Sequence, residues 1–340
     1  MIAGKRKKVY NITEVDYMKT KNYLIIVGVF LVTIITLSII LITRPNVENP
    51  DENISDELRE VLKTFECRLS SDKSYYIIYG LKNYENRRDE IRIPSSIDDI
   101  PVKKLLDEKT LNFIYLKNVK KIYIPETITY IGTSDKDNGL ANKAFLSSTG
   151  INEIIVDENN PVYSSDNGIL YNKDKTILIR YPISKVSDDN LVINFIDSVT
   201  EIYSYAFAMN NALLTVNFSE KITKIGSGAF YKCSNLVNIN FNKQNNIKTI
   251  QAYAFEDCRS LIDVTIANGV ESLGSSSFRG CINLYEIYLP KSLHDYGSHI
   301  FTGANNLEKV YTEADNIDFL KGIIDDLSLN KNAVIVEKEN

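Results

Sequence analysis

A short motif that returns every 23 to 25 residues limits what this 340-residue chain can fold into. Each copy begins with a leucine, continues with an alternating apolar strand pattern and ends on a phenylalanine. A fixed period of this length is typical of a solenoid, whose units stack on one another. It favours a protein that displays a binding surface over one that carries a catalytic centre. Four successive copies are Leu213–Phe230, Leu236–Phe255, Leu261–Phe278 and Leu284–Phe301.

A single copy of the motif cannot fold alone. The last copy offers five apolar side chains for burial, namely Leu284, Ile287, Leu289, Leu293 and Phe301. Their burial does not offset the backbone entropy that is lost when the whole repeat becomes ordered. Stacking of several repeats supplies the missing stabilisation, because each layer is then covered on both faces and hydrogen bonds link adjacent layers.

Two segments depart from the period. One step is 25 residues long because the segment 242–246 is longer than its equivalents, and we expect it to form a surface bulge. The other departure is a 62-residue interval between Phe145 and Phe207. The pair Asn167-Gly168 in this interval is a strong signal for a β-hairpin, because both central residues of such a turn need positive φ. The sequence therefore predicts a hairpin insertion at residues 160–182.

Several segments carry a resemblance to a known family. They read IYIPETITYIG (122–132), ITKIGSGAFYKCSNL (222–236) and VESLGSSSFRGCINL (270–284). They resemble BspA-type leucine-rich repeats, a 23-residue class found on many bacterial surfaces and in some protists. The resemblance covers residues 75–312 and includes the hairpin unit, with Ser277 and Ile300 in place of the alanine before the phenylalanine. It implies a curved solenoid used for adhesion or ligand binding, without catalytic residues.

Residues 23–43 form a run of 21 residues without a charge. This length spans a bilayer core as a helix. Six basic residues precede the run and only Arg44 directly follows it, which predicts a cytoplasmic N-terminus and an outward-facing repeat region. The run is longer than the apolar part of a cleaved signal peptide, and no small-x-small site follows it. We therefore expect an uncleaved signal anchor in the plasma membrane that crosses it once; the alternative is a buried core helix.

The regions before and after the repeats are expected to cover the two ends of the solenoid, because exposed end layers would destabilise it. Ser55 is expected to cap a helix with Leu58, Val61, Leu62 and Phe65 on one face. The expected organisation is a cytoplasmic tail 1–22, a transmembrane signal anchor 23–43, a linker 44–54, an N-terminal capping helix region 55–74, a leucine-rich repeat solenoid 75–312 and a C-terminal cap 313–340.

The charge of the chain excludes two classes of partner. The formal net charge is −5, and it becomes −9 without residues 1–43, which hold six basic and two acidic residues. Nucleic acids and anionic lipid surfaces attract basic proteins, so neither is expected as a partner of the outward-facing region.

Three of the four cysteines also follow the repeat. Cys233, Cys258 and Cys281 share the third position after the phenylalanine, where Ala304 stands in another copy. Adjacent layers place such residues ~4.7–4.9 Å apart, which is compatible with a disulfide. Stacked side chains run parallel and do not face each other, however, so we expect buried free thiols in a slot for small side chains.

Motifs for catalysis or metal binding are absent from the sequence. His294 and His299 do not share a helix face or join a cysteine or carboxylate cluster, so we interpret them as surface residues. The segment 135–146 resembles a calcium loop, but its glycine comes one position early and Leu146 replaces the required glutamate. The chain has no G-x-S-x-G, P-loop or G-x-G-x-x-G motif. We therefore expect neither an enzyme nor a cofactor.

Strand alternation decides which side chains of each repeat face outward. With Ile287 and Leu289 buried, their neighbours face solvent, and equivalent positions of the other copies form one face of a continuous parallel sheet. Amides and tyrosine rings on this face suit a peptide or a glycan. The alternative is a solvated sheet whose asparagines bond to one another along the stack. The candidate ligand-binding residues are Asn217, Asn240, Thr265, Glu286, Tyr288 and Tyr311.

These observations favour a membrane-anchored, cell-surface leucine-rich repeat protein that binds an extracellular protein or glycan non-covalently, in adhesion or recognition. The alternative is a scaffold or assembly component of the cell envelope that acts through its anchor and end caps. An enzyme is the third reading, and the sequence does not name the ligand.

Overall fold

The computed structural model describes residues 55–81, 89–105, 119–132, 150–185, 191–242, 244–312 and 334–337. The chain divides into two compact units, Met1–Ser55 and Asp56–Asn340, and helix α2 and the strands β1 to β23 all belong to the second. The predicted tail, anchor and linker (1–54) lie outside the described residues, apart from the junction at Ser55. Within the described ranges, no helix combines the length and apolarity that a membrane crossing requires.

The second unit begins with a short helix and a pair of strands. Helix α2 (Asp56–Thr64) has acidic residues in its first turn and Lys63 in its last, which suits the helix dipole. Its Leu58 and Val61 pack against the N-terminal part of the core. The helix is shorter than the predicted capping region, because Phe65 leaves it and begins β1 (Phe65–Leu69), which pairs antiparallel with β2 (Tyr76–Leu81).

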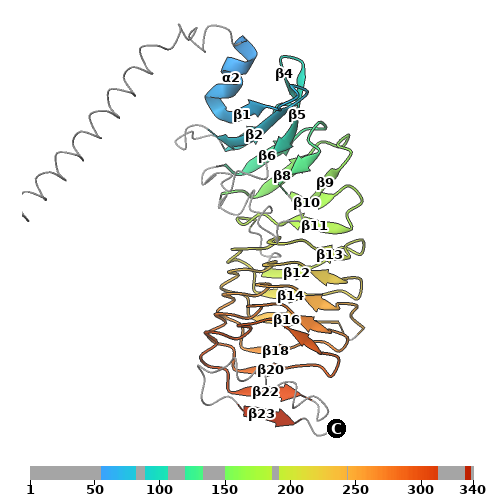
Figure 1. The fold of residues 1–340 in the computed structure, drawn as a ribbon, viewed down its shortest axis with the longest axis vertical. Helices are drawn as coiled ribbons and strands as arrows, with labels where there is room; N and C mark the ends of the chain where they lie inside the picture. Colours follow the sequence, from blue (N-terminus) through green and yellow to red (C-terminus); the bar gives the residue numbers. More distant parts are fainter. Residues whose placement is uncertain are drawn as a thin grey trace, which may run out of the picture. The chain divides into compact units, whose positions relative to one another are not determined.

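The repeats contribute two rows of short strands. The first row, which we call the strand face, carries the predicted candidate residues and runs one strand below another in Figure 1. Its strands are β3 (Glu90–Arg92), β6 (Lys121–Ile124), β8 (Glu153–Val156), β12 (Val192–Asn194), β14 (Thr215–Asn217), β16 (Asn238–Asn240), β18 (Asp263–Thr265), β20 (Glu286–Tyr288), β22 (Lys309–Thr312) and β23 (Val334–Glu337).

The second row begins where β5 pairs with β2, β4 and β7, and it continues as one eight-stranded sheet from β9 to β21. From β11 onward, each strand of this sheet pairs in parallel with the equivalent strand of the next repeat. Its strands are β4 (Ser96–Ile97), β5 (Ile100–Leu105), β7 (Tyr130–Ile131), β9 (Tyr163–Asp166), β10 (Ile169–Asn172), β11 (Ile177–Arg180), β13 (Glu201–Ile202), β15 (Lys224–Ile225), β17 (Thr249–Ile250), β19 (Ser272–Leu273) and β21 (Asp295–Tyr296).

The segment around the predicted insertion forms a hairpin. Strands β9 and β10 pair antiparallel, and the turn between them has φ values of 48° at Asn167 and 74° at Gly168. Asn160 fixes the start of this unit from inside the protein. Its Nδ2 donates hydrogen bonds to the carbonyls of Pro125 (2.8 Å) and Ile128 (2.9 Å). The hairpin continues into β11, which pairs in parallel with β13 and so joins the insertion to the repeats.

A column of phenylalanines runs through the core of the repeats, as their spacing predicts. Neighbouring rings are stacked, with centroids 5.0 to 6.0 Å apart. From Phe207 to Phe278, the backbone N–H of each phenylalanine donates to a carbonyl of the next repeat; for example, Phe255 N donates to Ser277 O at 2.8 Å. The inward residues predicted for the last copy are all buried. The members of the column are Phe207, Phe230, Phe255, Phe278 and Phe301.

The prediction of one continuous sheet on the strand face is wrong. The face is divided into three parallel sheets, β3-β6-β8, β12-β14-β16 and β18-β20-β22-β23. The hairpin unit lies in the chain between β8 and β12, at the first break. The second break lies between β16 and β18, in the 25-residue step with its longer segment 242–246. Extra residues after β16 therefore coincide with the loss of the ladder between two strands of the row.

Candidate functional site

The break between β16 and β18 opens into a groove of about 600 Å³ on the strand face, which we call the tyrosine groove. Residues of four strands and of the segments that follow them line it. Its walls combine amides, a carboxylate, hydroxyls and apolar side chains. The polar residues that line it are Asn240, Asn242, Asp263, Thr265, Asn268, Tyr288, Tyr311 and Thr312.

A pair of stacked tyrosines forms one wall of the groove. The rings of Tyr288 and Tyr311 lie 4.3 Å apart with an interplanar angle of 7°. The strand register places Thr265 on the other side of Tyr288. Threonine has no ring to continue the stack, and Thr265, Tyr288 and Tyr311 all line the groove. Desolvation raises the pKa of Tyr288, so its phenol is neutral at physiological pH.

Asparagines form a hydrogen-bonded row that leads to the groove. Asn217 Nδ2 donates to Asn194 Oδ1 at 2.8 Å, and Asn240 Nδ2 donates to Asn217 Oδ1 at 2.7 Å. This is the arrangement of the predicted alternative, in which the asparagines bond to one another. An amide has two N–H groups and two lone pairs on its oxygen, so each link uses only part of its capacity. The row is therefore fixed in orientation and keeps polar groups available to a ligand.

Four of the six candidate residues meet at the tyrosine groove: Asn240, Thr265, Tyr288 and Tyr311. Asn217 lies one strand away from it in the asparagine row. Glu286 belongs to the neighbouring column of the strand face and forms an ion pair of 2.6 Å with Lys309. The hydrogen bond that Lys309 Nζ donates to this carboxylate raises the pKa of Lys309.

Four further polar residues that were not chosen as ligand-binding candidates also line the groove: Asn242, Asp263, Asn268 and Thr312. Asp263 occupies an outward strand position, whereas the two asparagines follow the ends of β16 and β18. The extra residues after β16 were the available signal, because a longer connection at one repeat changes the surface beside it.

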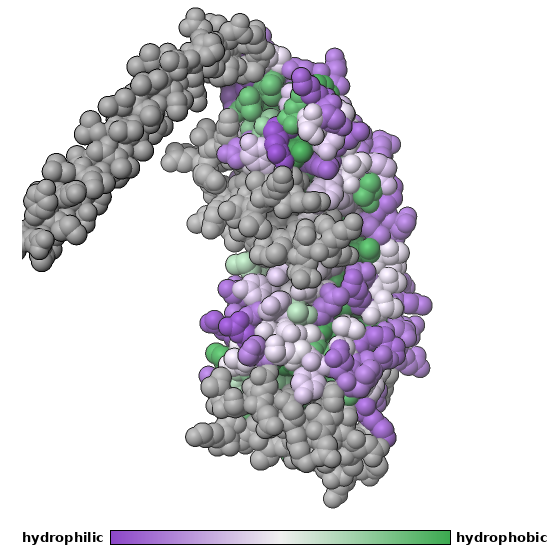
Figure 2. All heavy atoms as spheres, viewed as in Figure 1, coloured by the Kyte–Doolittle hydropathy of each residue, from purple (hydrophilic) through white to green (hydrophobic). Residues whose placement is uncertain are grey.

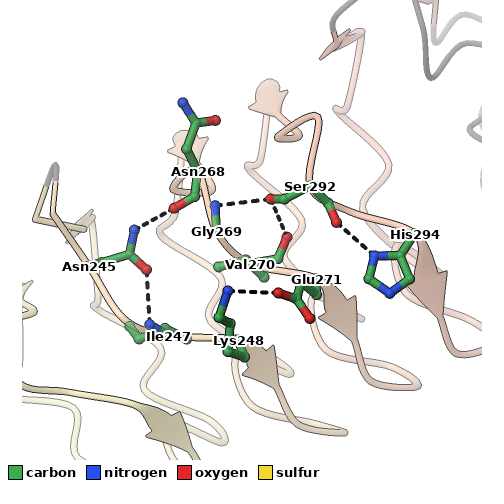
Figure 3. A network of polar contacts seen from close by, with 9 residues as sticks. All are labelled: Asn245, Ile247, Lys248, Asn268, Gly269, Val270, Glu271, Ser292 and His294. Atoms are coloured by element: carbon green, nitrogen blue, oxygen red, sulfur yellow. Dashed lines mark hydrogen bonds and ion pairs between the residues drawn. The ribbon is translucent and has the colours of Figure 1, made fainter.

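Hydrogen bonds between repeats hold the rim of the groove (Figure 3). Asn245 Nδ2, in the bulge, donates to the carbonyl of Asn268 at 2.8 Å. The Ser292 hydroxyl of the following repeat accepts from Gly269 N at 3.0 Å and donates to the carbonyl of Val270 at 2.7 Å. Three successive repeats are thus tied together beside the groove, which favours a preformed site.

A second groove of about 470 Å³ lies at the first break, beside the hairpin unit. Its walls are largely apolar and aromatic, with Tyr171 and Tyr181 from the hairpin and Phe195 after β12. Burial raises the pKa of Tyr181 to about 12, so its hydroxyl stays protonated. Asn194 lines this second groove, and Asn240 lines the first. The asparagine row therefore runs from one groove to the other.

No group of three or more potential metal ligands occurs among the residues that the structure describes. His294 is exposed, with Nδ1 2.9 Å from the carbonyl of Ser292. The predicted calcium-like segment 135–146 lies outside the described residues.

The predicted free thiols are confirmed. Cys233, Cys258 and Cys281 are unpaired and fully buried. Each thiol contacts the backbone carbonyl of a phenylalanine in the preceding repeat; for Cys258 the Sγ to Phe230 O distance is 3.2 Å. These contacts give the cysteine column a structural role inside the stack.

The surface agrees with a polar binding region. Figure 2 shows hydrophobic residues as small separate patches among hydrophilic ones on the face that it draws. A broad apolar patch would favour a large protein interface. The described part of this face instead suits contacts made by a few placed side chains.

Comparison with known proteins supports the fold. Residues 192–326 match the BspA type Leucine rich repeat region in six copies. The pneumococcal vaccine antigen PcpA is 20% identical, with a TM-score of 0.54 over 74% of this chain and 68% of that chain. A leucine rich cell surface protein from Faecalibacterium prausnitzii A2-165 is 18% identical, with a TM-score of 0.44 over 75% of this chain and 95% of that chain. No curated protein matches the chain.

Proposed function

We propose that this chain, whose residues 192–326 are BspA-type leucine-rich repeats, is a membrane-anchored cell-surface protein that binds an extracellular protein or glycan non-covalently. The observation that carries the proposal is the tyrosine groove, where Asn240, Thr265, Tyr288 and Tyr311 from four adjacent strands border one space. A concave site with a few placed polar groups and an aromatic wall is typical of ligand recognition.

The proposed anchor is the uncharged segment 23–43. Its length and its basic N-terminal flank support a single crossing with the repeats on the outer side. In that position the strand face meets ligands outside the cell. Adhesion or recognition follows from this placement.

A four-fold variant tests whether the strand face binds. We expect Asn217→Ala, Asn240→Ala, Thr265→Ala and Tyr288→Ala together to abolish capture of ligands by the chain, measured on a glycan array and by pull-down of extracellular proteins. Each change is expected to alter the free energy of unfolding by only about 0.5 kcal/mol, as is usual for surface positions. Any ligand that the wild-type and the variant bind with equal affinity must use another site.

The alternative function is a scaffold or assembly component of the cell envelope that acts through the anchor and the end caps. A comparison of the full chain with residues 55–340, checked for folding by circular dichroism, separates the two functions. Capture by both forms supports ligand display. Capture that requires residues 1–54 supports the scaffold and contradicts the proposed role of the strand face.

A further inference from the structure

We infer that the ligand of the tyrosine groove is a neutral oligosaccharide chain, which lies along the strand face with one sugar ring against the wall formed by Tyr288 and Tyr311. This inference rests on the proposed function and narrows it to one class of ligand. Four features of the groove support it: its charge, its shape, the state of the strand backbones beside it and the row of asparagines that leads to it.

The charge of the groove disfavours polyanionic ligands. Among the described residues that line it, Asp263 is the only one with a charged side chain, and none is a lysine, arginine or histidine. Lys309, on the neighbouring column, is already paired with Glu286 at 2.6 Å. Sulfated or phosphorylated chains need cationic partners. The amides, hydroxyls and single carboxylate of the groove instead match the hydroxyl groups of a neutral sugar, which both donate and accept hydrogen bonds.

The shape of the groove favours a flat ring. Tyr288 and Tyr311 stack on each other, the smaller Thr265 stands next to Tyr288 in the same column, and all three residues line the groove. Aromatic faces provide a large rigid contact area, and the polar edge of the site fixes the orientation of what is bound. A sugar ring presents an apolar face of C–H groups and a polar rim, so it fits both parts of this wall.

The backbones beside the groove disfavour a peptide strand. An extended peptide binds a sheet by pairing with an unpaired strand edge. At the groove, the edges of β16 and β18 that face each other are not paired in a ladder, because β16 pairs only with β14 and β18 only with β20 among the described strands. Strands β16 and β18 have Cα atoms within 8 Å of each other. An inserted strand would separate them by about 9.6 Å, which is twice the strand spacing.

The asparagine row extends the site beyond one sugar ring. Asn194, Asn217 and Asn240 are oriented by their mutual hydrogen bonds. The six strands from β12 to β22 span at least ~24 Å along the row. A chain of sugars can therefore follow the row from the Tyr288 ring toward the second groove. In this arrangement the hydroxyl groups of successive sugars form hydrogen bonds with the side-chain amides of successive asparagines.

The test uses the full chain and immobilised neutral hexasaccharides of glucose, mannose, galactose and N-acetylglucosamine, with heparin and gelatin as polyanionic and peptide probes. We expect binding to at least one neutral hexasaccharide and none to heparin or gelatin. Tyr288→Ala should weaken this binding by about tenfold or more, as for an aromatic hot spot. Tyr288→Phe keeps the ring and should change affinity less than about threefold, because aromatic area dominates such contacts.

A second variant blocks the groove without removing the tyrosine wall. Thr265→Tyr is expected to add a third ring to the stack of Tyr288 and Tyr311 and to abolish sugar binding while the chain stays folded. Tyr253→Ala is the matched control, because Tyr253 is 39% exposed, lies two residues before Phe255 and is not among the residues that line the tyrosine groove. It should leave the affinity unchanged.

The outcomes separate the inference from the proposed function. Binding only to heparin or gelatin, if the four-fold alanine variant loses it, overturns the sugar inference and leaves ligand display intact. Sugar binding that survives both Tyr288→Ala and Thr265→Tyr overturns the assignment to the tyrosine groove. A chain that binds none of the probes also overturns the inference.

Discussion

At the residue scale, Phe255 shows how one side chain per repeat organises the core. Its ring stacks between Phe230 at 5.2 Å and Phe278 at 5.3 Å. The regular spacing in the sequence was sufficient to predict that these residues are buried, because equivalent positions of stacked repeats have the same packing environment. The asparagines were harder to interpret, since an outward amide can bond to its neighbour, to a ligand or to both.

Replacement of Phe255 by alanine tests the column. We expect Phe255→Ala to lower the free energy of unfolding by about 3–5 kcal/mol, because a buried aromatic leaves a cavity and two neighbouring rings lose a contact. Chemical denaturation measures the change. Phe241→Ala is a suitable control, because Phe241 is only partly buried and should cost less. A loss below ~1 kcal/mol for Phe255→Ala would contradict its place in the core.

Because of the buried thiols, the free energy of unfolding should depend on pH in the alkaline range. Burial raises the pKa of Cys233 from its ordinary value of 9.0 to about 12, and burial also raises the pKa of Cys258 and Cys281. Above pH 9 the unfolded chain loses thiol protons that the folded chain retains. The folded state then binds more protons, so the free energy of unfolding should fall as pH rises from about 9 toward 12.

Two measurements check this expectation. Alkylation followed by mass analysis should leave the three buried thiols unmodified until denaturant is added. Denaturation at pH 8 and pH 10 should give a lower stability at the higher pH, and replacement of all three cysteines by alanine should reduce that difference. Rapid alkylation of Cys258 in the folded chain would show that the column is accessible.

At the element scale, the phenylalanine turn contains special backbone positions that the repeat pattern did not reveal. The residues two before and two after each phenylalanine have positive φ in every repeat from Phe207 to Phe301. Around Phe230 these are Gly228 (φ 60°) and Lys232 (φ 58°). Glycine recurs there at 228, 280 and 303, which was a usable signal. At the equivalent positions of the other repeats the residue is not glycine, so the sequence did not show that these positions need positive φ.

A glycine scan reveals this requirement. We expect Lys232→Gly to be more stable than Lys232→Ala by about 1 kcal/mol, because an L-residue with a Cβ is strained at positive φ. The alanine variant accounts for the loss of the lysine side chain, including its position 5.0 Å from the Tyr231 ring. The same pair of changes at Lys224, in β15, should have the opposite order, since glycine weakens a strand. Equal stability of Lys232→Gly and Lys232→Ala would contradict a strained turn.

The break between β16 and β18 is a second element-scale feature that the sequence did not predict. The extra residues in 242–246 were recognised as a bulge, but their effect on the neighbouring ladder depends on how the loop bonds. Asn245 uses its amide to join the next repeat through the carbonyl of Asn268 at 2.8 Å. Such a contact between repeats cannot be predicted from the period alone, and it lies beside the tyrosine groove, which Asn268 lines.

At the scale of the whole molecule, the period determined the class of fold and the alternation determined its outward face. Four of the six candidate residues meet at one groove. The remaining two were chosen by the same alternation, which identifies a face but not where that face is hollowed. The hollow arises from irregularities, namely the extra residues after β16 and the change from Thr265 to Tyr288 along one column.

The proposed position of the repeats outside the cell is tested by cysteine labelling. A chain with Asn49→Cys in the linker 44–54 should react with a membrane-impermeant thiol reagent on intact cells. A chain with Asn11→Cys in the segment 1–22 should react only after the cells are permeabilised. Both variants carry Cys67→Ser, because Cys67 is only partly buried, whereas the other three cysteines are buried. The basic residues before segment 23–43 provide the physical reason, since positive flanks remain on the cytoplasmic side. Labelling at position 11 and not at position 49 on intact cells would reverse the orientation and place the tyrosine groove beyond the reach of extracellular ligands.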